Sequence, residues 1–241
     1  MQVAKVYSKP IMATLKHPSL LMSSSRVAWE RQHLSIHLSK LQRWYENNFM
    51  PEIPTKHSLL DAFMYPRSQI CQGNWYLYVV CRYLKPSTVV ETGIYKGVSS
   101  ACILQALHDN GKGRLFSIDL PNVKSGIEGF NYMEDFSLNG RRVGYLVPKH
   151  LEDRWHLIIG DAKQKLPELL SELDSVDIFH HDSLHTYNQM IFEFETVFPK
   201  LTILLLSDDT GRNNAFRDFA AKNNLHMTML NENGMLEKQN S

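Results

Sequence analysis

Acidic residues recur along this sequence at the positions where buried strands are predicted to end. They are Glu91, Asp119, Asp161, Asp182 and the pair Asp208-Asp209. Ligands of open α/β sheets bind beyond the carboxyl ends of the strands, so these acids are expected to border one site. A single acid after a strand is commonly only a helix cap, and Asp161 fits that alternative. Acids at five successive strand ends favour a binding or catalytic site.

The densest group of chemically useful side chains lies between Asp177 and Tyr187, where three histidines accompany Asp182. Such a group suits proton transfer or metal binding. His180 and His181 alternate along a predicted strand and therefore face opposite sides, so at least one is expected to be packed and hydrogen-bonded. Asp182 and His185 follow that strand, where a loop can turn both side chains into the site.

The pair Asp208-Asp209 follows the next predicted strand, which is expected to neighbour the strand before Asp182. Three converging carboxylates repel one another unless a cation joins them. Oxygen ligands of this kind suit Mg²⁺, Mn²⁺ or Ca²⁺ better than zinc. The alternative is that Asp209 caps the helix expected near Asn213 and that Asp208 is solvated.

A glycine turn follows the first predicted strand, because Gly93 and Gly97 frame a bend where the backbone can approach a ligand. Ser99 and Ser100 are expected to cap the helix that begins there. A dinucleotide fingerprint is missing, since Tyr95 occupies its middle glycine position. A P-loop is also missing, since only three residues separate the glycines.

The acids around this turn narrow the choice of cofactor. Glu91 before the turn would repel phosphates, but it suits the ammonium and sulfonium groups of S-adenosylmethionine. Asp119, one strand later, is placed to bind ribose hydroxyls, and the segment 160–162 would border the adenine. The pattern therefore favours S-adenosylmethionine, and a turn shaped only by packing is the alternative.

These residues need a sheet to bring them together, and the chain from Thr88 onward alternates strands with helices. Strands are predicted at 88–91, 114–118, 156–159, 176–180 and 202–206, and helices at 74–84, 99–109, 163–173, 188–198 and 213–223. Such alternation predicts a mostly parallel α/β sheet with helices on both faces. Asn233-Gly234 within the segment 225–238 predicts a closing antiparallel hairpin.

The domain organisation is expected to be a flexible tail at 1–25, a helical cap at 26–85 and a cofactor-binding domain at 86–241. The cap is a candidate surface for homo-oligomer formation. The long connection at 120–155 is rich in aromatic and basic residues and is expected to be a lid over the substrate. A structural insertion that packs on the N-terminal helices is the alternative.

The amino-acid composition indicates which binding partners and which cellular compartment to expect. The 241 residues carry a net charge of +1, which gives no reason to expect nucleic acid or a membrane surface. No apolar run approaches the roughly 18 residues that span a bilayer. The three cysteines are scattered, which is typical of reduced thiols in a cytoplasmic protein.

The chain resembles the class I S-adenosylmethionine-dependent methyltransferases of the small-molecule group called methyltransferase family 24. The resemblance rests on five stretches in order, at 90–100, 115–121, 147–161, 179–187 and 206–209. It implies a Rossmann-like sheet of seven strands that ends in an antiparallel hairpin. The residues expected to bind the cofactor are Glu91, Thr92, Gly93, Tyr95, Gly97, Ser99, Ser100, Asp119, Leu120, Gly160, Asp161, Ala162 and Asp182.

The resemblance also suggests how the reaction is assisted. Related sugar and antibiotic O-methyltransferases hold a divalent metal at positions that match Asp182, Asp208 and Asp209. Some of them use an acid two residues after the first ligand as base. Leu184 stands there in this chain, so His185 is the nearest replacement.

The expected function is methyl transfer to an oxygen of a small molecule such as a sugar or another hydroxylated metabolite. Asp182 and His185 are the expected catalytic residues, with Mg²⁺ or another divalent cation as a candidate helper. Two alternatives are a nicotinamide-dependent oxidoreductase and a non-catalytic protein that binds the cofactor. Tyr95 in the glycine turn argues against the first, and the retained site acids argue against the second.

Overall fold

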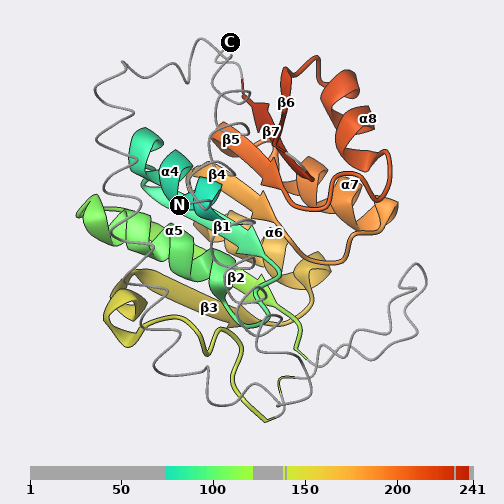
Figure 1. Ribbon diagram of the computed structural model, residues 1–241. Coiled ribbons are helices and arrows are strands. Elements are labelled where there is room, and N and C mark those ends of the chain that lie inside the picture. The colour runs from blue at the N-terminus through green and yellow to red at the C-terminus, as the bar shows by residue number, and fades with distance from the viewer. Residues whose placement is uncertain (1–73, 122–137, 139, 231, 239–241) are drawn as a thin grey trace, which may run out of the picture.

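The computed structural model describes residues 74–121, 138, 140–230 and 232–238, which form a sheet of seven strands between two layers of helices (Figure 1). The expected tail at 1–25, the helical cap up to residue 73 with its oligomer surface, and the lid segment 122–137 lie outside the described residues.

The strand order is β3-β2-β1-β4-β5-β7-β6, with β1 to β5 parallel and β7 antiparallel to both β5 and β6. This confirms the predicted Rossmann-like sheet and its closing hairpin. The strands are β1 (Thr88–Thr92), β2 (Arg114–Asp119), β3 (Trp155–Ile159), β4 (Val176–His181), β5 (Leu201–Ser207), β6 (Met227–Leu230) and β7 (Asn233–Glu237).

The helices lie within two residues of their predicted bounds. They are α4 (Trp75–Leu84), α5 (Val98–Asp109), α6 (Ala162–Glu172), α7 (Tyr187–Val197) and α8 (Ala215–Lys222), with a short 3₁₀ helix η5 (Lys149–Arg154). Among these described helices, none has the length and apolar character that crossing a bilayer requires.

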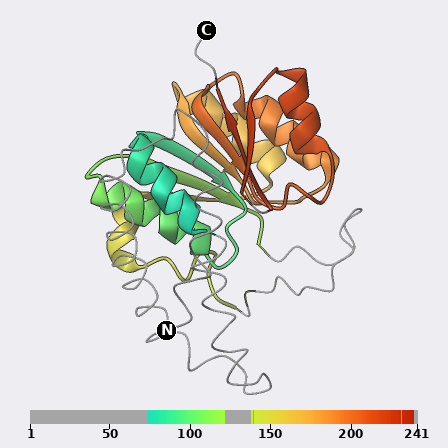
Figure 2. The same cartoon turned by 45° about the horizontal axis from the view of Figure 1, so that its top comes forward.

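Each face of the sheet is covered by its own set of helices (Figure 2). Val89 and Ile178 pack in the core cluster with α4 and α5, whereas Val90 and Phe179 pack in the cluster with α6, α7 and α8. Neighbouring strand residues therefore point to opposite faces, as the two-residue period of a strand requires. Both faces are apolar, which explains why these strands read as continuous hydrophobic runs.

Backbone hydrogen bonds continue past the ends of the central strands. The amide of Gly93 donates to the Ile118 carbonyl at 2.9 Å, and the amide of Asp182 donates to the Thr92 carbonyl at 2.8 Å. The amide of Asp208 likewise donates to the His181 carbonyl at 3.0 Å. These bonds align the first residues after β1, β4 and β5 in one row, so side chains far apart in sequence become neighbours.

The second part of the expected lid is a structural insertion that packs on the glycine turn. The amide of Gly144 donates to the Tyr95 carbonyl at 2.9 Å, and the amide of Leu146 donates to the Lys96 carbonyl at 2.9 Å. A small apolar cluster that includes Val143 closes over the same turn. These residues hold the turn in shape.

Replacing Gly93 with alanine is expected to destabilise the fold much more than the same change at Gly111. Both glycines have a left-handed φ, +82° and +68°, so both variants carry the backbone strain of about 1–2 kcal/mol. A Cβ on Gly93 would also lie 1.9 Å from the Asp182 carbonyl oxygen, whereas a Cβ on Gly111 would meet no atom within 4 Å.

Denaturant unfolding measures the difference, and Gly93→Ala should lose about 1–3 kcal/mol more than Gly111→Ala because the clash adds to the strain. Equal losses in the two variants would contradict the close approach of the turn to the loop after β4.

Candidate active site

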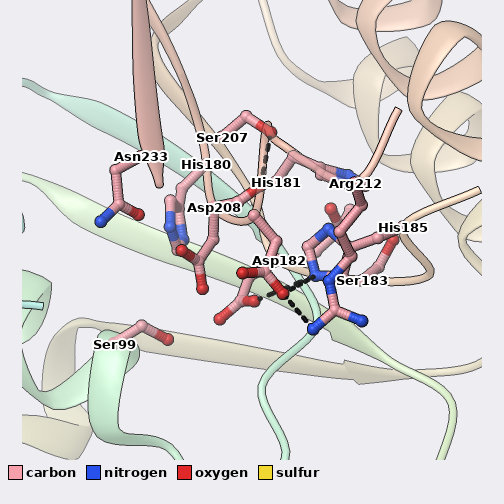
Figure 3. Close-up of polar contacts among 12 residues, drawn as sticks. Ser99, His180, His181, Asp182, Ser183, His185, Ser207, Asp208, Arg212 and Asn233 are labelled. Atoms are coloured by element: carbon pink, nitrogen blue, oxygen red, sulfur yellow. Dashed lines mark hydrogen bonds and ion pairs between the residues drawn. The ribbon is translucent and has the colours of Figure 1, made fainter. Parts of the chain in front are cut away.

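The loops after β4 and β5 bring together three carboxylates, a histidine and an arginine (Figure 3). Nε2 of His185 lies 3.6 Å from Oδ1 of Asp182 and 4.0 Å from Oδ2 of Asp209. Arg212 forms an ion pair with the same oxygen of Asp209. The expected approach of Asp182 to the acidic pair is therefore confirmed, and the imidazole ring lies between two of the acids.

Asn213 ties the two loops together. Its Nδ2 donates to the backbone carbonyl of His185 at 3.1 Å, and its Oδ1 accepts from the amide of Ala215 at 2.8 Å. The side chain that starts helix α8 thus also holds the loop that carries the histidine. Asp209, the alternative cap, lies instead beside Arg212 and His185.

Burial and mutual repulsion change the proton affinities of the acids. Burial raises the pKa of Asp182 to about 7, with His180 opposing the shift and Glu91 adding to it. Burial and the negative charge of Asp182 raise the pKa of Asp208 to about 6. Burial also lowers the pKa of His185, against the attraction of Asp209, so its imidazole is neutral near pH 7.

The expected metal site does not take shape in the geometry. Although Asp182, Asp208, Asp209 and His185 are neighbours, no group of three or more His, Cys, Asp or Glu side chains across residues 74–121, 138, 140–230 and 232–238 has an arrangement that could hold a metal ion. Asp209, one of the three expected ligands, is already paired with the guanidinium of Arg212. The residues present therefore do not fit a divalent cation.

Glu91 is fully buried beneath the glycine turn. Its carboxylate accepts hydrogen bonds at 2.6 Å from both Ser99 and Ser100, and at 2.9 Å from Ser117. The two serines therefore do not cap helix α5, which begins after Gly97 without a side-chain cap. Glu91, Ser99 and Ser100 lie next to the turn, as predicted. Their side chains point into the protein interior, although they had been expected to face the ligand.

His180 extends this buried group toward helix α4. Its Nδ1 lies 3.4 Å from Glu91, and its Nε2 lies 3.4 Å from the hydroxyl of Tyr76, which also donates to Asn233 at 3.2 Å. Hydrogen bonding to Glu91 and its negative charge raise the pKa of His180 against the opposing effect of burial.

Glu193 forms a second buried group on the opposite face of the sheet. Its carboxylate lies 2.6 Å from Nδ1 of His181, and three further side chains donate to it at 2.6–2.8 Å: Thr92, Ser183 and Gln189. Burial alone would raise the pKa of Glu193, but the His181 charge and these hydrogen bonds outweigh it and lower the pKa. At least one of His180 and His181 was expected to be packed in the interior, and both are fully buried.

Asp119 ends strand β2 and supports the glycine turn. Its Oδ2 accepts from the backbone amides of Ile94 at 2.6 Å and Tyr95 at 2.7 Å. Two exposed apolar side chains flank it, since Leu120 follows it in the chain and Ile159 pairs with it in the sheet. Asp161 caps helix α6 through the Lys163 amide at 2.8 Å, so the helix-cap alternative holds for this residue.

Four residues of this region could not be identified from the sequence: Glu193, Arg212, Asn213 and Ile159. Glu193 stands in an amphipathic helix pattern beside the exposed Glu195, and nothing local separates the two. Arg212 and Asn213 follow an acidic pair in a turn, where solvated polar residues are common. Only Ile159 has a signal in the sequence that could have indicated a role in the site, because it is an apolar residue at a strand end immediately before Gly160.

Glu193→Gln is expected to lower the free energy of unfolding by about 1–3 kcal/mol, because it removes the buried charge that His181 faces. The matched control is Glu195→Gln on the same helix. Glu195 is 48% exposed and pairs with Lys222 at the surface, so its loss should stay within about 0.5 kcal/mol. Urea unfolding of both variants measures the difference, and similar losses would show that the buried carboxylate contributes no more than a surface charge.

Comparison with known proteins agrees with this geometry. Residues 90–209 match the model of methyltransferase family 24, which is described as a methyltransferase domain. No curated protein matches the sequence.

Several solved structures share the fold at low sequence identity. The calicheamicin methyltransferase CalS11 is 17% identical, with a TM-score of 0.55 over 88% of this chain and 93% of its own. The Podospora anserina methyltransferase PaMTH1, solved with S-adenosylhomocysteine bound, is 12% identical, with a TM-score of 0.52 over 91% and 97%. The O-methyltransferase NovP is 15% identical, with a TM-score of 0.51 over 86% and 100%.

The family match covers the glycine turn, both buried carboxylate groups and the acidic pair after β5, and it spans the sheet from β1 to β5. The chain therefore belongs to the class I S-adenosylmethionine-dependent methyltransferases of family 24.

Proposed function

We propose that this enzyme methylates a hydroxyl oxygen of a small molecule, with a sugar or another hydroxylated metabolite as the acceptor class. The observation that carries the proposal is the position of His185, held between Asp182 and Asp209 beside the row of strand ends. Two structural relatives support the proposal: CalS11 is a TDP-rhamnose 3′-O-methyltransferase, which supports a sugar acceptor, and NovP is an O-methyltransferase, which supports oxygen as the accepting atom.

The donor side of the site fits S-adenosylmethionine. Both amide bonds to Asp119 use Oδ2, so Oδ1 remains for the ribose hydroxyls. Leu120 and Ile159, which are 50% and 51% exposed, provide apolar surfaces on which an adenine ring can lie. Exposed apolar side chains on either side of an acid are costly in water, and a flat heterocycle with a ribose would cover them.

The acceptor side performs the proton transfer. When bound, S-adenosylmethionine supplies a methyl group that its sulfonium already activates. His185 accepts the hydroxyl proton at Nε2, because its lowered pKa leaves the ring neutral near pH 7. The carboxylates of Asp182 and Asp209, at 3.6 and 4.0 Å, stabilise the imidazolium that forms.

We also place the enzyme in the cytoplasm. Cys81 is a buried free thiol, as thiols of a reducing compartment are. Fractionation of cells that express the full chain tests this assignment.

Calorimetry with S-adenosylhomocysteine tests the donor site. The wild type should release measurable heat, and Asp119→Asn should bind about 10–100-fold more weakly because it loses a charged hydrogen-bond acceptor. Asp174→Asn, at an exposed position in the turn before β4, is the matched control and should bind like the wild type. No heat from the wild type at millimolar ligand would rule out the proposed donor.

His185→Gln is expected to lower kcat about 10²–10⁴-fold while leaving S-adenosylhomocysteine binding unchanged, because it removes the proton acceptor only. The measurement is S-adenosylhomocysteine formation with a panel of nucleotide sugars and other hydroxylated acceptors. His226→Gln, at an exposed position before β6, is the control and should keep full activity. Equal activity of the wild type and His185→Gln would remove His185 from the mechanism.

A further inference from the structure

We propose that Arg212 supplies the fixed positive charge at the acidic end of the active site in the place of a divalent cation, so that this enzyme transfers its methyl group without a metal. The inference rests on the proposed function and goes beyond it, because it assigns a role to a residue of the turn after β5 and restricts how the acceptor can be held.

The backbone of this turn directs Arg212 onto Asp209. The amide of Arg212 donates to the carbonyl of Asp209 at 3.1 Å, which closes the turn. Asp209 has a φ of +49°, a left-handed conformation that aspartate tolerates better than most residues. The guanidinium therefore folds back over the carboxylate three residues before it and pairs with Oδ2.

Contacts on both sides fix the turn. The amide and hydroxyl of Thr210 donate to the carbonyl of Glu232 at 2.9 and 2.8 Å, and Thr210 is almost completely buried. On the other side, Asn213 donates to the carbonyl of His185. The contacts of Thr210 and Asn213 fix the backbone of the turn, and the ion pair with Asp209 holds the Arg212 side chain, which is 39% exposed.

Arg212 holds one of the two oxygens through which Asp209 could bind a cation. Oδ2 of Asp209 pairs with the guanidinium and also lies 4.0 Å from Nε2 of His185. A divalent cation that used this oxygen together with Asp182 and Asp208 would have to displace Arg212 from it. Its charge would then face the displaced guanidinium and would draw Asp182 and Asp209 away from His185. Arg212 therefore supplies the positive charge that the ion would have carried, and the neutral imidazole lies beside the same carboxylate.

This substitution changes what the acceptor must offer. A bound cation would hold the acceptor through acceptor oxygens that fill its open ligand positions. Arg212 acts through Asp209, which it keeps beside His185, so an isolated hydroxyl is enough for the proton to be removed. The specificity of the enzyme should therefore extend to acceptors without a neighbouring hydroxyl or carbonyl group.

Manganese binding tests the proposal without an acceptor, by electron paramagnetic resonance on the full chain with S-adenosylhomocysteine present. The wild type should bind Mn²⁺ no more tightly than about 1 mM. Arg212→Gln should bind Mn²⁺ at least about tenfold more tightly, since the competing charge is gone. Adding Asp208→Asn to this variant should abolish the gained binding and so localise it.

Three further variants are controls. Arg212→Lys keeps the charge and should exclude Mn²⁺ like the wild type. Arg217→Gln, at an exposed position on helix α8, removes the same charge elsewhere and should also behave like the wild type. Arg212→Met replaces Arg212→Gln if the latter does not fold, as judged by S-adenosylhomocysteine affinity in the same samples.

Two results would overturn the proposal. Micromolar Mn²⁺ binding by the wild type that Asp208→Asn abolishes would place a cation beside Arg212. Unchanged Mn²⁺ affinity in both Arg212→Gln and Arg212→Met would show that the arginine excludes nothing. Absence of S-adenosylhomocysteine binding by the wild type would instead contradict the proposed function, so the two failures are distinguishable.

Discussion

Two buried carboxylates, each beside a histidine of β4, are the constraint on which the active site depends. Glu91 pairs in the sheet with His180, and Thr92 pairs with His181, so the strand period sends the first pair to one face and the second to the other. Glu193 meets the second pair from helix α7. Burying a charge costs several kcal/mol unless partners surround it, and hydroxyl, amide and imidazole groups surround both carboxylates.

These buried groups fix the loops that carry the chemistry. Ser183 lies between Asp182 and His185 in the chain, and its hydroxyl donates to Glu193 at 2.7 Å. The loop after β4 is therefore tied to helix α7 at its centre and to the turn after β5 at His185 through Asn213. Because the loop is held at two points, the His185 ring stays close to its partners, which is the positioning that the proposed proton transfer requires.

The sequence predicts the sheet well and the directions of side chains less well. Alternating strands and helices, together with the Asn233-Gly234 turn, are local signals, and the sheet order and hairpin follow them. The acids were found because each ends a strand. Whether such a side chain faces a ligand or the interior depends on partners distant in sequence, as the three serines around Glu91 illustrate. The role of Glu193 depends on β1 and β4 in the same way, and no pattern within α7 reveals it.

The donor cradle carries backbone strain that its neighbours offset. Tyr95 has a φ of +51°, a left-handed conformation that costs a bulky residue of order 1–3 kcal/mol. Its amide donates to Asp119, and its carbonyl accepts from Gly144, so both of its backbone groups are satisfied in that conformation. Asp119 thus shapes the turn with one oxygen and leaves the other for a ligand. Because the strained shape is held by bonds within the protein, the cradle is formed before the donor arrives, and binding energy need not be spent on bending the turn.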